Sequence, residues 1–75
     1  MLNKLMEKIN SYFYTIETNN NSTTIEIEFK EYSMVFMVIN NQCKIFKFDL
    51  DNNIIDESKW YKRAGNVWNK FLSMT

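Results

Sequence analysis

The chain of 75 residues has no histidine and no proline, and it has one glycine and one cysteine. Histidine is the commonest general base and metal ligand, so its absence excludes a Cys–His nucleophile. A zinc site is excluded with it, because a single cysteine cannot form one alone. Cys43 also has no partner for an internal disulfide, and no glycine-rich phosphate loop is present. We therefore expect a protein that is not an enzyme and that needs no metal or cofactor.

Charge of one sign is not in excess either. Basic and acidic residues number nine each, whereas a dedicated nucleic-acid-binding protein would have a clear basic surplus. No hydrophobic run is long enough to span a bilayer, and the N-terminal stretch does not resemble a secretory signal. We expect one domain spanning residues 1–75 in the cytoplasm, or in the host-cell cytoplasm if a phage encodes it, without membrane contact.

The sequence does contain many aromatic residues: six Phe, four Tyr and two Trp. Each can remove roughly 150–250 Å² from water, so a chain this short can form a core without disulfide or metal. Asparagine is abundant and takes the place of glycine and proline at turns. The abundance of Asn, Lys and Ile is typical of AT-rich genomes, such as those of low-GC bacteria and their phages.

Two segments have helical periodicity. Residues 2 to about 12 are predicted to form a helix whose apolar side is Leu2, Leu5, Met6, Ile9 and Phe13. A second helix is predicted to start after a cap at Asp56 or Ser58 and to end near Met74. Its apolar side would carry Trp60, Tyr61, Ala64, Val67, Trp68, Phe71 and Leu72.

Between the helices, apolar and polar residues alternate as in strands. The predicted strands are residues 12–18, 23–30, 33–40 and 43–50. Asparagine-rich turns join the first and the last pair, and a tight connection at Glu31 and Tyr32 joins the middle pair. The fold class is therefore α+β: an N-terminal helix, an antiparallel meander of three or four strands and a C-terminal amphipathic helix.

Loop lengths give the predicted register. A four-residue loop at 19–22 places Ile16 opposite Ile25. A two-residue loop at 31–32 places Ile27 opposite Phe36, and a three-residue loop at 40–42 places Phe36 opposite Phe46. One sheet face would then be the core, carrying Ile25, Ile27, Phe29, Met34, Phe36, Val38, Phe46 and Phe48.

The segment 33–40, SMVFMVIN, is apolar on both faces. If both helices cover the core face, the second face stays open, with Val35, Met37 and Ile39 at its centre. The first helix could instead cover this face and give three layers, or the strand could simply be hydrophobic. Contiguous apolar surface with a charged rim is typical of interaction sites. The residues expected on this face are Phe13, Val35, Met37, Ile39, Cys43 and Ile45, with Glu17, Glu26, Glu28, Lys47 and Asp49 around them. The candidate partner-binding residues among them are Val35, Met37, Ile39, Ile45, Glu26 and Glu28.

A second candidate surface is basic. The last predicted helix carries Lys59, Lys62, Arg63 and Lys70 on its polar side, where they could contact an acidic protein or phosphates. A solvated helix face is the alternative.

The order helix, three strands, helix resembles that of double-stranded-RNA-binding domains, and SKWYKRAG places cations at the start of the last helix as those domains do. The Gly-Pro-His loop and the Lys-Lys-x-Ala-Lys pattern of those domains are absent, so the chain is not assigned to that family.

These observations favour a non-enzymatic protein-binding module. The expected partner is a larger protein, or a second copy in a homodimer, and the expected role is that of a small phage- or mobile-element-type inhibitor or adaptor. Such a protein would act in anti-defence or host takeover by occluding its partner. The alternative function is a nucleic-acid-binding regulator that uses the basic residues of the last helix.

Overall fold

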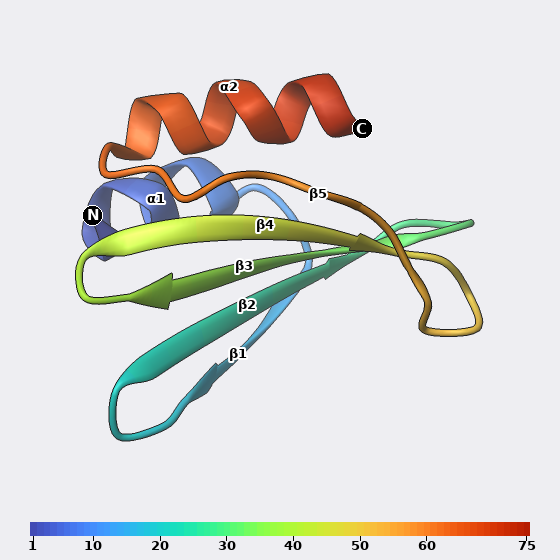
Figure 1. Ribbon diagram of the computed structural model, residues 1–75, viewed down its shortest axis with the longest axis horizontal. Helices are drawn as coiled ribbons and strands as arrows, with labels where there is room; N and C mark the ends of the chain where they lie inside the picture. Colours follow the sequence, from blue (N-terminus) through green and yellow to red (C-terminus); the bar gives the residue numbers. More distant parts are fainter.

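The computed structural model describes residues 1–75 and contains two helices and one antiparallel sheet of five strands (Figure 1). The strands lie in the sheet in their chain order. The predicted α+β class, with a helix before and after a meander, is confirmed, while the fifth strand was not predicted. The elements are α1 (Leu2–Ile9), β1 (Tyr14–Thr18), β2 (Ser22–Glu28), β3 (Ser33–Ile39), β4 (Gln42–Phe48), β5 (Ile54–Glu57) and α2 (Ala64–Met74).

Both helices pack on the same face of the sheet (Figure 1). Phe36 of β3 is fully buried under α2, with its ring centroid 5.1 Å from that of Phe71. Of the two arrangements left open by the sequence, the one in which the first helix covers the opposite face is ruled out, because Leu5 and Ile9 of α1 belong to this same core. The buried apolar residues are Leu5, Ile9, Ile25, Ile27, Met34, Phe36, Val38, Cys43, Ile45, Ala64, Val67, Phe71 and Met74.

The first hairpin has the predicted register. Ile16 lies opposite Ile25 and Tyr14 opposite Ile27, so four residues, 19–22, separate the last paired residues of this hairpin. β2 alternates strictly between buried and half-buried or exposed side chains, and this alternation leaves only one phase in which its isoleucines meet the core.

The second hairpin differs from the prediction by two residues. Ile27 lies opposite Met34, and Ile25 opposite Phe36. Residues 29–32 connect the two strands, and within this connection the Phe29 N–H donates to the Tyr32 carbonyl at 2.8 Å and the two rings stack at 4.8 Å. A shift of two residues keeps every side chain on its predicted face.

The third hairpin differs by one residue, which reverses the faces of β4. Asn40 and Asn41 both have positive φ, at 51° and 59°, and form a two-residue turn of the kind that matches strand twist. Phe36 therefore lies opposite Ile45 and not Phe46. The predictions that Cys43 and Ile45 lie on the second face, and Phe46 and Phe48 on the core face, are wrong for this reason.

The segment before α2 is extended rather than helical. Residues 54–57 form β5 along β4, and Tyr61 exchanges two backbone hydrogen bonds of 2.8 Å with Cys43. Ser58, which lies between β5 and Tyr61 in the chain, is buried, and its hydroxyl accepts a hydrogen bond from the Ile45 N–H at 2.8 Å. The predicted helix start after Asp56 or Ser58 is thus wrong, because β4 satisfies the backbone of this segment and α2 begins at Ala64.

The first helix is also shorter than predicted. It ends at Ile9, and the strand that follows begins at Tyr14. Phe13, predicted on the apolar side of this helix, lies between the two elements with a side chain that is 98% exposed.

The Asn40–Asn41 turn can be tested by substitution. Asn41→Val should lower the free energy of unfolding by about 1 kcal/mol, because a β-branched side chain is poorly accommodated at positive φ, and Asn41→Gly should raise it by about 0.5 kcal/mol. Urea denaturation measures both changes. Asn20→Val is the matched control, since Asn20 is also in a turn but is not among the residues with positive φ. Unchanged stability of Asn41→Val would contradict the turn geometry.

Candidate functional site

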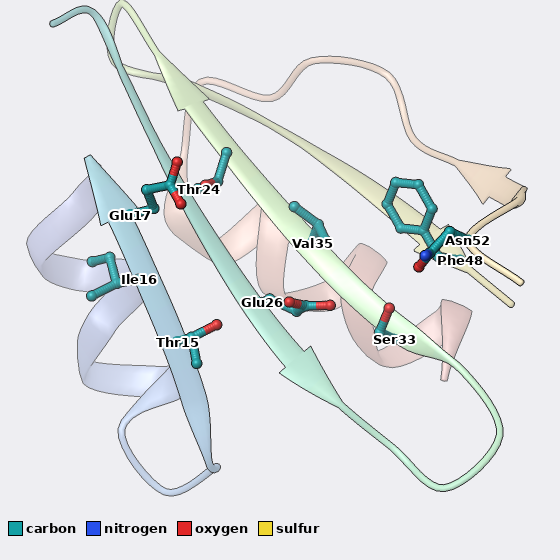
Figure 2. Close-up of a pocket in the computed structure, with 9 residues that line it drawn as sticks. All are labelled: Thr15, Ile16, Glu17, Thr24, Glu26, Ser33, Val35, Phe48 and Asn52. Carbon is teal, nitrogen blue, oxygen red and sulfur yellow. The ribbon is translucent and has the colours of Figure 1, made fainter. Parts of the chain in front are cut away.

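One face of the sheet is not covered by either helix, and we call it the open face. Figure 2 looks onto this face, with both helices behind the sheet. Its half-buried apolar side chains come from two neighbouring strands. They are Val35, Met37 and Ile39 of β3 and Phe46 and Phe48 of β4. The open face therefore presents a connected apolar strip to the surroundings.

Acidic side chains surround this strip. The register places Glu17 of β1, Glu26 and Glu28 of β2 and Glu57 of β5 on the open face. Lys44 is the one strand lysine on it, and its Nζ lies 2.9 Å from a carboxylate oxygen of Glu57. Four glutamates and one lysine give the open face a negative potential that favours positively charged ligands.

Glu26 lies at the centre of the open face. It is opposite Thr15 on one side and Val35 on the other, and the one ion pair of the chain, Lys44–Glu57, does not include it. Three adjoining depressions share Glu26 in their walls. One of the three crosses the sheet as an open groove (Figure 2). Its lining residues are Thr15, Ile16, Glu17, Thr24, Glu26, Ser33, Val35, Phe48 and Asn52.

The structure brings most of the predicted sheet-face residues together. Val35, Met37, Ile39, Glu26 and Glu28 all lie on the open face. Ile45 does not, because it is fully buried in the core.

Lys47, predicted at the rim of the open face, also lies on the helix side. Its Nζ donates to the Met74 carbonyl at 2.8 Å and sits 4.3 Å from the centre of the Tyr32 ring. The residues that the sequence analysis missed are Phe46 and Phe48, and the signal that could have placed them is the Asn-Asn pair as a two-residue turn.

The predicted basic stripe does not form on one helix face. Lys59, Lys62 and Arg63 precede α2, and only Lys70 belongs to it. Lys62 and Arg63 instead line a depression together with Lys4 of α1. Lys59 is turned elsewhere, with its Nζ 5.4 Å from the centre of the Tyr61 ring. A small cationic patch of Lys4, Lys62 and Arg63 thus replaces the predicted stripe.

Two side chains have pKa values that their surroundings shift clearly, Cys43 and Asp49. Cys43 is fully buried, and burial raises the pKa of its thiol from 9.0 to about 12, although a backbone hydrogen bond with Met37 acts in the opposite direction. The carboxylate of Asp49 accepts hydrogen bonds from the backbone N–H groups of Asn53 and Asp51, and these lower its pKa. The Asp49 carboxylate therefore stabilises the turn formed by residues 49–53. No group of three or more His, Cys, Asp or Glu side chains gathers where it could hold a metal ion.

Neither helix combines the length and the apolar character needed to cross a membrane. Comparison with protein-family models, with curated proteins and with solved structures finds no match to this chain, so its function is inferred from the geometry just described.

The burial of Cys43 makes a direct prediction. At pH 8 the folded chain should react with iodoacetamide about 1000-fold more slowly than the chain in urea, because the thiolate is the reactive form and its fraction falls tenfold for each unit of pKa. The pKa of the Cys43 thiol is higher in the folded chain than in the unfolded chain. The free energy of unfolding therefore keeps the full contribution of the buried thiol below pH 9 and loses it as the pH rises towards 12. Mass spectrometry measures the labelling, and rapid labelling of the folded chain would contradict the register of β4.

Proposed function

We propose that this protein is a non-enzymatic binding module that docks through its open face onto a basic surface of a larger protein. The observation that carries the proposal is Glu26, a carboxylate without an ion-pair partner beside an uncovered apolar strip. An arginine or lysine of the partner would meet Glu26 in the groove, while apolar side chains of the partner would cover Val35 and Phe48.

The charges favour a foreign basic protein over a second copy at this face. Two open faces packed against each other would bring together eight glutamates and two lysines, since each copy contributes Glu17, Glu26, Glu28, Glu57 and Lys44. Like charges facing each other across an interface oppose association. The groove is also open and spans several strands, which suits a protein surface better than an enclosed small molecule.

The proposed mode of action is occlusion. A chain of this size that has one buried cysteine and no histidine acts best by covering a site on another molecule. An inhibitor or adaptor of the phage or mobile-element type, used against defence systems or in host takeover, works in this way. Its acidic face would compete with nucleic acid for a basic surface of the target.

The proposal predicts that Glu26→Gln weakens binding of the partner at least about tenfold, because truncating a buried charged contact typically costs 2 kcal/mol or more. Val35→Lys should weaken it as well by placing a cation in the path of the basic partner. The measurement is affinity capture from host lysate on the immobilised chain, followed by titration of the captured protein with each variant.

Glu7→Gln is the matched control, since Glu7 is an exposed carboxylate on α1. Thermal unfolding of each variant shows whether the fold is kept. A partner that binds wild type, Glu26→Gln and Val35→Lys equally would contradict docking through the open face. Unfolding of Val35→Lys alone leaves Glu26→Gln, an isosteric change, to decide.

A second candidate function is nucleic-acid binding through the patch of Lys4, Lys62 and Arg63. The observation in its favour is that these cations line one depression, although they come from different ends of the chain. Phosphates bind such patches mainly by displacing counterions.

This alternative predicts salt-dependent binding to duplex DNA or RNA. With three phosphate contacts, the logarithm of the affinity should fall with the logarithm of salt concentration with a slope of about −3. Fluorescence anisotropy with a labelled duplex measures the slope. The double substitution Lys62→Gln and Arg63→Gln should flatten it to about −1, and absent binding at low salt would rule the function out.

A further inference from the structure

The β1 edge of the sheet has little of the usual protection against pairing with another strand, since Glu17 is its only charged residue. All five of its residues are exposed, and the sequence YTIET contains no lysine, no proline and no bulge. Natural edge strands are normally blunted by such features. The other edge differs, because β5 has only four residues and a register shift between Lys47 and Phe48 disturbs its pairing.

The free backbone groups of β1 can be identified from the hairpin. The Asn19 N–H donates to the Ser22 carbonyl at 2.8 Å. Antiparallel ladders alternate between hydrogen-bonded and non-hydrogen-bonded pairs, so Glu17 and Thr15 direct their N–H and C=O groups towards β2. Tyr14, Ile16 and Thr18 direct theirs away from the sheet, where a further strand could meet them.

We propose that β1 is a homodimerisation edge that pairs antiparallel with β1 of a second copy, on a two-fold axis through Ile16. In this register Ile16 lies opposite Ile16 of the second copy, and Tyr14 lies opposite its Thr18. All three outward-facing residues then exchange backbone hydrogen bonds, and the two sheets become one continuous sheet with all four helices on the same side.

The side chains of β1 favour this register and this partner. Glu17, the only charged residue of β1, lies opposite Thr15 of the second copy, so no like charges face each other. A shift that moves the axis to Glu17 would place the two carboxylates directly opposite. Pairing also gives apolar neighbours to Ile16, which is 48% exposed on a strand that the helices do not cover. Phe13, the residue before β1, would gain Glu17 of the second copy as a diagonal neighbour.

This dimer is compatible with the proposed function and independent of it. The second copy approaches in the plane of the sheet, so Glu26 and Val35 stay accessible on the open face. A chain that dimerises but binds no basic protein would refute only the proposed function, and a monomer that binds one would refute only the dimer.

Sedimentation equilibrium of the full chain tests the proposal. The expected molar mass is twice the 9.1 kDa of the monomer at high micromolar concentration. Ile16→Lys should reduce it to 9.1 kDa, because two ammonium groups would then meet on the two-fold axis. Ile55→Lys is the matched control on the other edge, at a side chain 52% exposed, and should remain dimeric.

Amide hydrogen exchange locates the interface. The amides of Tyr14, Ile16 and Thr18 should become more protected as the protein concentration rises, while the β5 amides should not change. A monomeric wild-type chain, a dimer that survives Ile16→Lys, or a dimer that Ile55→Lys disrupts equally would each overturn the proposal.

Discussion

The left-handed turn at Asn40 and Asn41 is the constraint on which the rest of the structure depends. With two residues in this turn, Ile39 pairs with Gln42, and every later side chain of β4 has its face assigned. Cys43 and Ile45 then complete the core beneath α2, while the two β4 phenylalanines are left outside it. A third turn residue would exchange these sets and remove the aromatic half of the open face.

The sequence predicts the fold class and the first hairpin because β2 has one unambiguous phase. Its isoleucines alternate with glutamates, and only one face of such a strand can be buried. β3 has no such phase, since Met34, Phe36 and Val38 match Val35, Met37 and Ile39 in apolar character. Several registers then pair apolar residues with apolar residues, and turn geometry decides between them.

The same ambiguity limits what sequence alone says about the sites. Val35, Met37 and Glu26 lie on the open face as predicted, because the shift of two residues between β2 and β3 leaves every side chain on the same face. The prediction of a basic stripe was wrong because Trp60 and Tyr61 fit a helical period although their segment is extended. The backbone of Tyr61 bonds to Cys43, and the Ser58 hydroxyl accepts a hydrogen bond from the Ile45 N–H of β4. A helical period in the sequence carries no information about hydrogen bonds to a strand that is distant in the chain.

The Lys47 side chain has a consequence for motion within the domain. Its ammonium group joins three segments at one corner: β4 itself, the last turn of α2 through Met74, and the β2–β3 turn through Tyr32. The opposite border, β1, is tied to the rest mainly by backbone bonds to β2. Rigidity should therefore decrease across the sheet from β4 to β1, which leaves the strand with unsatisfied edge groups as the most adaptable part of the framework.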